Sequence, residues 1–375
     1  MDQIRFQAPQ LPTLDDAQKY WSASEQSQWF SNGGPCLKAL EVRLADYVGE
    51  SVEAVPVSSA TAGLLIALRA VAEPGVRKLV VVPSYTFAAT AAIVHWAGFE
   101  PLFVDIDPEH WHVDPGGLAD ALRAHPDEVA AAVLCSTYGT APPRTVVAEW
   151  ERLCAEHSVP LVVDSAAGFG SRDEDGRPIG TAGDAEVFSF HATKPFAIGE
   201  GGVVMTKSSE TAARLRRLAN FGFSSARVVD GAIGLNGKMD ELHAALALCV
   251  LDQLEGILER RRGYAEVLRL ALEEQHFSFQ TGNHSSAFQF LPMLCSSREE
   301  RDALIARAAE QNIELRAYFG DPLHQMPAFG SSPRMPLPVT DDVAGRVVCL
   351  PIYNTMTDST LQRLIAVCTP ETPAS

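Results

Sequence analysis

The chain alternates short apolar runs with longer segments in which apolar residues recur every three or four positions. Seven runs in the first 206 residues have the length and composition of buried strands: 54–57, 79–82, 101–104, 129–135, 160–163, 187–190 and 203–206. Most segments between them have the period of an amphipathic helix, as in 36–48 with Leu37, Leu40 and Leu44. Strands that alternate with helices predict an α/β fold with a doubly wound, mostly parallel sheet.

The pattern changes near residue 275. Apolar runs at 288–294 and 347–350 predict two further strands, and helical periods at 297–310 and 360–367 accompany them. This mixture is typical of a small α+β unit. We therefore expect a large domain over residues 1–255, which includes an N-terminal segment 1–35, and a smaller α+β domain over residues 256–375.

Two further expectations concern the second half of the chain. A long helix begins near Met239, and the arginine triplet 260–262 is expected in its exposed tail. The segment 321–338 contains five prolines. We expect this segment to form a mobile flap over the functional site, because irregular loops often carry function.

The composition excludes several classes of function. The 375 residues carry a formal net charge of −17 and contain no long run of Lys or Arg. Nucleic acids and anionic membranes require cationic patches, so neither partner is expected. The seven cysteines include no CxxC pair, which argues against a disulfide framework and against a zinc site. Because no signal peptide or membrane-spanning run is visible, we expect a cytoplasmic enzyme without a metal.

Polar and aromatic residues follow the ends of several predicted strands. In chain order they are Ser59, Thr61, Phe87, Asp164, Ser189 and Lys194. The carboxyl ends of parallel strands meet at one edge of the sheet, where open α/β sheets bind their ligands. A lysine buried at that edge has a lowered pKa and can attack a carbonyl carbon. The alternative is an ordinary surface lysine that follows a strand.

The turn 58–63 reads Ser-Ser-Ala-Thr-Ala-Gly and precedes a helix. Small hydroxyl residues at such a turn are good N-caps, and the same geometry presents free backbone N–H groups to a phosphate. Common nucleotide-binding motifs are missing here. No G-x-G-x-x-G follows the first strand, and residues 231–238 miss the P-loop spacing by one position.

The order of motifs along nearly the whole chain resembles a known family. The matching residues are Gly34-Pro35, Ser59-Ala60-Thr61-Ala62, 83–90, Asp105-Ile106-Asp107, Asp164, Ser189-Phe190-His191, Lys194, 199–202, Gly234-Leu235-Asn236, 241–245, Pro322-Leu323-His324 and Leu350-Pro351. They resemble the DegT/DnrJ/EryC1/StrS sugar aminotransferases, which are fold-type I pyridoxal-phosphate enzymes. This resemblance implies a mostly parallel seven-stranded sheet sandwiched by helices, a smaller C-terminal domain, and a homodimer with shared active sites.

The resemblance also implies roles for individual residues. Lys194 would form a Schiff base with pyridoxal 5'-phosphate and then serve as the base that moves a proton. Asp164 would pair with the pyridinium nitrogen, which keeps the ring an electron acceptor. Asn236 would reach the phosphate from the neighbouring subunit; its alternative reading is a turn residue. The remaining implied cofactor contacts are Ser59, Ala60, Thr61, Ala62, Phe87, Ser189 and His191.

The chain departs from the family at two places near the expected site. Ala167 stands where the family usually has Gln or His, a side chain that commonly contacts the cofactor's 3-hydroxyl group. The segment 136–139 reads Ser-Thr-Tyr-Gly instead of the usual His-Leu-Tyr-Gly. Substrate contacts are therefore assigned only by position, and they are Tyr138, His191, Tyr318 and His324.

The expected reaction moves an amino group from an amino acid, with L-glutamate as the expected donor, to a ketone on a nucleotide-linked deoxysugar or a related natural-product intermediate. One alternative is a pyridoxal-phosphate enzyme that acts on a non-sugar substrate or performs elimination or dehydration. The family's dehydratases have histidine in place of the lysine, so Lys194 argues against that branch, whereas Ala167 keeps unusual chemistry open. A third possibility is a catalytically silent regulatory or scaffold protein, which the intact Lys194 and Asp164 disfavour.

Overall fold

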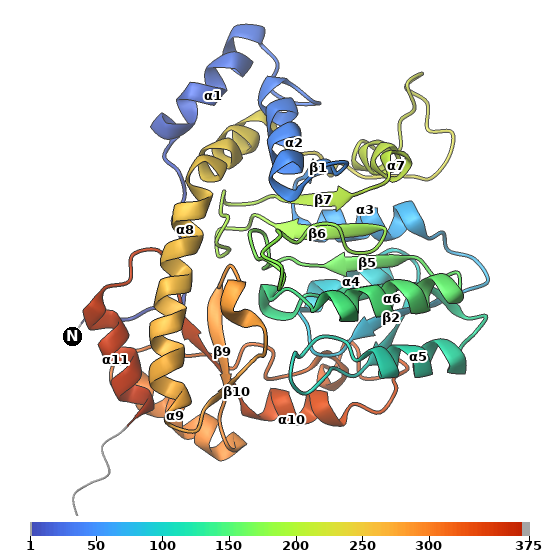
Figure 1. Cartoon of the computed structure of the whole chain (residues 1–375). Helices are drawn as coiled ribbons and strands as arrows, with labels where there is room; N and C mark the ends of the chain where they lie inside the picture. Colours follow the sequence, from blue (N-terminus) through green and yellow to red (C-terminus); the bar gives the residue numbers. More distant parts are fainter. Residues whose placement is uncertain (1, 370–375) are drawn as a thin grey trace, which may run out of the picture.

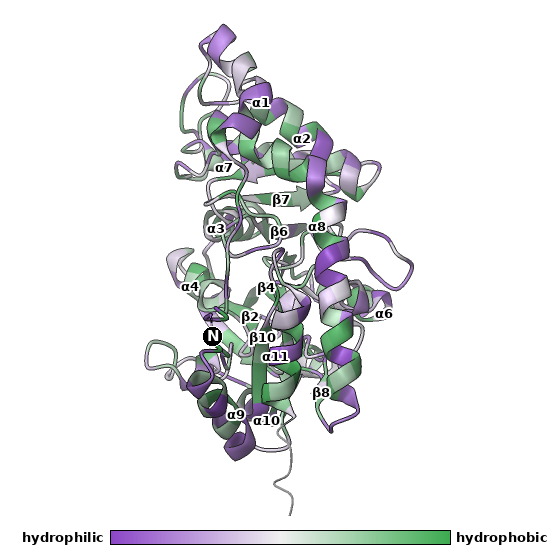
Figure 2. Cartoon of the chain, turned by 90° about the vertical axis from the view of Figure 1, so that its left-hand side faces the viewer, coloured by the Kyte–Doolittle hydropathy of each residue, from purple (hydrophilic) through white to green (hydrophobic). Residues whose placement is uncertain are grey.

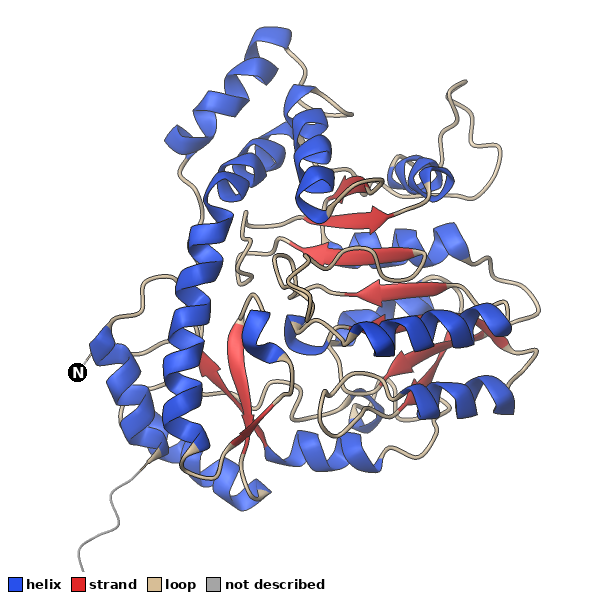
Figure 3. Cartoon of the chain, viewed as in Figure 1, coloured by secondary structure: helices blue, strands red, loops and turns tan. Residues whose placement is uncertain are grey.

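The computed structural model describes residues 2–369 and contains a seven-stranded sheet and a three-stranded sheet (Figures 1 and 3). The large sheet has the order β1-β7-β6-β5-β4-β2-β3. Strand β7 is antiparallel to β1 and β6, and the other neighbours pair in parallel. The strands are β1 (Glu53–Val57), β2 (Leu79–Pro83), β3 (Glu100–Val104), β4 (Val129–Cys135), β5 (Leu161–Asp164), β6 (Ala185–Ser189) and β7 (Gly202–Thr206). The predicted fold class is confirmed.

Helices cover both faces of this sheet because its side chains alternate between them. In β2, Val80 and Val82 pack with one group of helices and Leu79 and Val81 with another. Figure 2 shows the apolar colour of the buried strand β7. The helices of this part are α1 (Leu14–Ser27), α2 (Pro35–Val48), α3 (Ala60–Val71), α4 (Ala88–Trp96), α5 (Pro115–Ala124), α6 (Arg144–Glu156) and α7 (Ser209–Ala219).

The 33-residue helix α8 (Glu241–Glu273) runs from the large sheet to the three-stranded sheet (Figure 1). The predicted boundary at 255/256 therefore falls inside one continuous helix. Beyond α8 the chain forms the C-terminal elements, most of which share an apolar cluster around β9 and β10. They are β8 (Ser278–Phe279), β9 (Phe290–Leu294), α9 (Arg298–Glu310), α10 (Pro338–Arg346), β10 (Val347–Pro351) and α11 (Asp358–Cys368).

Register brings the strand ends together. Asp164, the last residue of β5, pairs with Cys135 of β4 on one side and with Val187 of β6 on the other. At the start of β7, a Cβ atom on Gly202 would lie 2.9 Å from the backbone nitrogen of Ala60. Only glycine permits this approach, so Gly202 lets the first turn of α3 lie against the sheet.

The arginine triplet differs from the prediction of an exposed helix tail. Helix α8 continues to Glu273, and Arg261 is buried. Its guanidinium donates to Asn354 Oδ1 and to the backbone carbonyls of Phe288 and Ile352 at 2.7–2.9 Å. The prediction is therefore wrong for Arg261, because these three acceptors replace water around the buried cation.

The proline-rich segment 321–338 does not form the flap over the functional site that we predicted. Leu323, Phe329 and Leu337 are buried in the same cluster as helices α3 and α4. The backbone of Phe103 on edge strand β3 exchanges hydrogen bonds with Pro333 and Met335 at 3.0 and 2.9 Å. The segment thus covers the sheet edge, a place where prolines are tolerated because few ladder donors are needed.

Across residues 2–369, no helix combines the length and apolarity needed to cross a membrane. All seven cysteines are free and buried, as expected for core residues. In this part of the chain no cluster of three or more His, Cys, Asp or Glu side chains is arranged to hold a metal ion.

Candidate active site

A cavity of about 440 Å³ opens at the carboxyl ends of β1, β4, β5 and β6. Its C-terminal wall comes from residues near β9 and from the segment before α10. Among the residues singled out from the sequence, the cavity is lined by Ser59, Ala60, Thr61, Phe87, Tyr138, Asp164, Ala167, Ser189, His191, Lys194 and Tyr318. These residues come from six separated parts of the chain. The fold therefore brings them to one edge of the sheet, as their positions near the ends of the predicted strands suggested.

Helix α3 presents its N-terminus to this cavity. Ser59 is the N-cap, and its hydroxyl accepts a hydrogen bond from the Ala62 backbone N–H at 3.1 Å. Thr61 and the Ser189 hydroxyl line the cavity nearby. Free N–H groups, hydroxyls and the positive end of a helix dipole together suit a phosphate group. Ala62 contributes through this cap and does not itself line the cavity.

Asp164 is buried at the end of β5. Its Oδ2 accepts from Thr90 Oγ1 at 2.7 Å, and its Oδ1 accepts from the Ala166 backbone N–H at 3.1 Å. Burial raises the pKa of this carboxyl group, whereas the two hydrogen bonds and the nearby Lys194 oppose that rise. A buried carboxyl with fixed hydrogen bonds suits a cationic ring nitrogen, since a positive partner favours its ionised form.

Lys194 follows β6 and reaches into the same cavity. Burial lowers the pKa of its amine from 10.5 to about 8, although Asp164 and Cys135 act in the opposite direction. Near neutral pH an appreciable part of this amine is therefore unprotonated, and only that form can attack an aldehyde. Its Nζ donates to Gln289 Oε1 at 2.8 Å.

Aromatic rings form another side of the cavity. Phe87, the N-cap residue of α4, is 55% exposed, and its ring is parallel to that of Tyr318 with centroids 6.5 Å apart. Tyr138 is buried, with a φ of 60°. Its hydroxyl bonds to the Tyr85 hydroxyl and donates to the Tyr318 carbonyl, both at 2.7 Å. Phe87 is thus free to cover a planar ligand, while the Tyr138 hydroxyl is already engaged.

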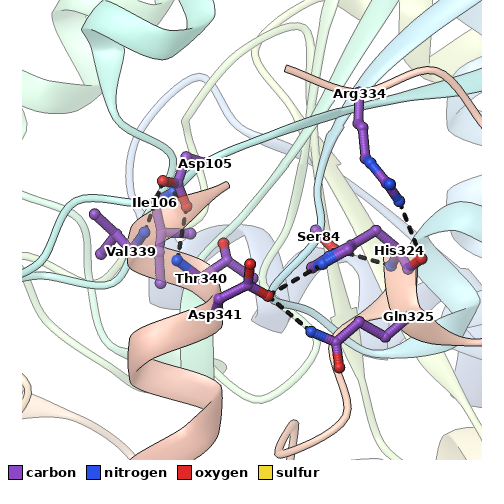
Figure 4. A network of polar contacts seen from close by, with 9 residues as sticks. All are labelled: Ser84, Asp105, Ile106, His324, Gln325, Arg334, Val339, Thr340 and Asp341. Carbon is purple, nitrogen blue, oxygen red and sulfur yellow. Dashed lines mark hydrogen bonds and ion pairs between the residues drawn. The ribbon is translucent and has the colours of Figure 1, made fainter. Parts of the chain in front are cut away.

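Besides Ala62, two predicted site residues lie outside this cavity. His324 Nδ1 bonds to Ser84 Oγ at 2.7 Å, and its Nε2 lies 3.1 Å from Asp341 Oδ1 (Figure 4). It is held there because the segment 321–338 packs on the sheet edge. Asn236 Oδ1 accepts from Lys238 Nζ at 2.8 Å and lines no part of the cavity of its own chain.

Several cavity residues escaped the sequence analysis. Gln289 interrupts a run of apolar residues just before β9, and an amide in such a run was a usable signal. Arg316 and Gln7 lie in irregular segments and carried no pattern that pointed to a site. The missed lining residues with polar side chains are Gln7, Thr86, Ser136, Thr193, Glu200, Gln289 and Arg316.

Ala167 places a methyl group where a polar side chain was expected. The neighbouring Ser165 hydroxyl does not replace it, because it lies within 2.8 Å of Ser136 Oγ and donates to the buried carboxylate of Glu186 at 2.5 Å. Burial raises the pKa of Glu186 to about 7. The departure is therefore a real difference in the polarity of the cavity wall.

Known proteins share this architecture. A family model for the DegT/DnrJ/EryC1/StrS aminotransferases matches residues 14–369. The dTDP-4-amino-4,6-dideoxy-D-glucose transaminase of Shigella dysenteriae is 30% identical over 365 residues, with 96% of each chain covered. Two solved structures are also similar: a protein from Bacillus cereus ATCC 10987 assigned as a PLP-dependent aminotransferase (29% identity, TM-score 0.92, 98% and 100% covered) and DesI with its TDP-sugar product (32% identity, TM-score 0.88, 98% and 92% covered).

These matches agree with the geometry of the cavity. The residues around it suit pyridoxal phosphate, since a lysine, a buried carboxyl and a helix N-terminus face one space. The enzyme class and the cofactor predicted from the sequence are confirmed by the family. The chain belongs to the DegT/DnrJ/EryC1/StrS family of pyridoxal-phosphate-dependent aminotransferases.

Proposed function

We propose that this protein is a cytoplasmic aminotransferase that moves an amino group from an amino acid, with L-glutamate as donor, to a ketone on a nucleotide-linked deoxysugar. The observation that carries the proposal is the meeting of Lys194 and Asp164 in one cavity beside the N-terminus of α3. The names of two relatives support the substrate class, since one is a dTDP-sugar transaminase and the other was solved with a TDP-sugar product.

In this proposal Lys194 has two tasks. Its amine, with a pKa lowered to about 8, would hold the cofactor through its aldehyde carbon, and as a free amine it would carry a proton between two carbon atoms. Pyridoxal phosphate, when bound, supplies the electron sink for the carbanion. Asp164 would keep the ring nitrogen of the cofactor protonated, and Thr90 fixes the orientation of the Asp164 carboxylate.

The phosphate of the cofactor would be held by the first turn of α3 and by Ser189. The backbone N–H groups there have no intrahelical partner, and the helix dipole favours a dianion. The exposed Phe87 side chain lines the same space and would cover one face of the cofactor's pyridine ring. It would thereby exclude water from that face.

The sugar nucleotide enters past Arg316 and Tyr318. The Arg316 guanidinium lines the cavity and is the cation there besides Lys194. It lies over the Phe6 ring at 5.0 Å and pairs with Glu314, so its position is defined before the substrate arrives. A diphosphate linkage is a suitable partner for a guanidinium, because the guanidinium can donate two parallel hydrogen bonds to two phosphate oxygens.

We also propose a homodimer in which Asn236 completes the active site of the partner. Large apolar side chains in the loop before Asn236 are 39–80% exposed, as expected for a surface that meets another chain. They are Phe221, Phe223, Val228, Val229 and Ile233. Asn236→Ala should weaken cofactor retention by about tenfold, because it removes a hydrogen bond to a charged phosphate. Equilibrium dialysis against the cofactor measures this, and a dimer structure with Asn236 far from either active site would overturn the shared site.

A second candidate is a family member that acts on a non-sugar ketone or eliminates water. Ala167 favours it, since the cavity lacks the polar side chain common in the family at this position. The deciding experiment converts the enzyme to its pyridoxamine form with a panel of amino donors and then offers nucleotide-sugar and non-sugar ketones. Recovery of the visible absorbance only with nucleotide-sugar ketones supports the transaminase, whereas products that have lost water support elimination. Absence of any cofactor absorbance would indicate a silent protein.

A further inference from the structure

Gln289 places an amide against the amine of Lys194. The residue precedes β9, is 4% exposed, and interrupts a run of apolar residues. Its Oε1 accepts from Lys194 Nζ at 2.8 Å, and its Nε2 donates to Thr193 Oγ1 at 3.2 Å. The protonated lysine has donors only, so the amide oxygen must face it. Both ends of the amide are therefore used, and its orientation is defined.

The contact extends into a short polar network. Thr193 Oγ1 lies 2.9 Å from His191 Nδ1, and His191 Nε2 lies 3.7 Å from Glu200 Oε1. Gln289 is the member of this network that comes from the C-terminal part of the chain. It joins that part to the loop that carries Lys194.

We propose that Gln289 is a positioning residue, which holds the released amine of Lys194 at one point of the cavity while that amine transfers a proton. This inference rests on the role proposed above for Lys194. A free lysine side chain has many rotamers, and an amine that leaves the reacting carbon loses its effect as a base. The contact with Gln289 reduces that freedom at the stage when the amine is no longer bound to the cofactor.

The neutrality of the amide matters for this task. A carboxylate at the same distance would favour the ammonium form and make the amine a poor base near neutral pH. An amide fixes the amine without adding a negative charge. The other titratable or charged groups that face the same cavity are Asp164, Cys135, His191, Glu200, Arg316, Tyr138 and Tyr318.

The first test uses the cofactor-free enzyme. The rate at which acetic anhydride modifies Lys194 is measured against pH by peptide mass spectrometry. Gln289→Glu should raise the midpoint of this curve by about one pH unit or more, because a carboxylate stabilises the ammonium. Gln289→Leu should lower the midpoint, since it removes an acceptor for the ammonium hydrogens. Unchanged midpoints in both variants would overturn the proposal.

The second test uses the holoenzyme and a donor deuterated at the carbon that loses the proton. Gln289→Leu should slow the half-reaction about 10- to 100-fold, increase the isotope effect, and leave donor affinity nearly unchanged. Gln289→Glu should restore part of the rate with its optimum moved to higher pH. A Gln289→Leu variant with wild-type rate and isotope effect would contradict the positioning role.

Gln280 provides a matched control. It is also a buried amide, 2% exposed, with Oε1 bound to Thr140 and Nε2 to the His110 carbonyl, but it does not line the cavity. Gln280→Leu should reduce stability without changing the Lys194 labelling curve. The labelling test needs no cofactor, so its result concerns the role of Gln289 alone. The proposed function is tested separately, and it fails if the cofactor of the wild-type enzyme is not attached to Lys194.

Discussion

The cavity has one wall at the large sheet and one from the C-terminal part of the chain, and the two walls differ in the kind of structure that carries their residues. On the sheet side, Asp164 and Ser189 end β5 and β6, Lys194 lies in the turn after β6, and the parallel pairing of these strands brings their ends to one edge. On the C-terminal side, Gln289 reaches the cavity from the bend before β9, and Arg316 reaches it from an irregular segment. The residues proposed to act on the cofactor are placed by the ends of neighbouring strands, whereas the wall proposed to meet the substrate comes from irregular segments. That division allows one wall to vary without disturbing the other.

The largest effect is expected on the sheet side. Lys194→Ala should reduce turnover by about four orders of magnitude or more, because it removes both the covalent attachment and the proton carrier. Steady-state kinetics and a thermal melt measure activity and folding together. Full activity in a folded Lys194→Ala protein would refute the role of this residue.

The same lysine makes the stability of the cofactor-free enzyme depend on pH. Its pKa is about 8 in the folded chain and has an ordinary value of 10.5. Between these values the unfolded chain binds more protons, so stability rises with pH from about 8 to 10.5 and is lowest below 8. Lys194→Met should therefore stabilise the apoenzyme at pH 7 by up to about 3 kcal/mol, with no gain left near pH 11. Urea unfolding at several pH values measures this, and an equal gain at every pH would contradict it.

On the C-terminal side, Arg316→Gln should raise KM for the nucleotide sugar by about tenfold with little change in kcat, because a hydrogen-bonded ionic contact made in ground and transition states is lost. Arg346→Gln is the control, since Arg346 pairs with Asp342 away from the cavity. An Arg316→Gln enzyme with unaltered KM would remove this residue from the substrate wall.

The smallest effect on activity is expected at His324, which sequence reasoning placed at the substrate. His324→Ala should leave turnover within about twofold of wild type and reduce stability by about 1 kcal/mol, because it breaks the contacts with Ser84 and Asp341. Kinetics and urea unfolding on one preparation test both. A large loss of turnover with unchanged stability would return His324 to the site.

Most of the fold and the sheet-side wall could be predicted from the sequence. The apolar periodicity locates the strands, and only a few polar residues lie near the strand ends, so the candidates for the site were few. The sequence could not supply the C-terminal wall, because contacts between Lys194 and a residue 95 positions away depend on how β9 packs beside the large sheet. His324 shows the converse error. The five prolines of 321–338 suggested a flap, and His324 was placed at the substrate, yet Leu323 and Phe329 pack this loop against the core. The buried Arg261 was missed because its acceptors lie up to 93 residues away.

The most direct measurement is reduction of the holoenzyme with borohydride, followed by peptide mapping. The account predicts that the reduced cofactor is attached to the peptide that contains Lys194 and that Lys194→Ala carries none. Attachment to a different lysine, or a wild-type enzyme with no attached cofactor, would contradict the central claim.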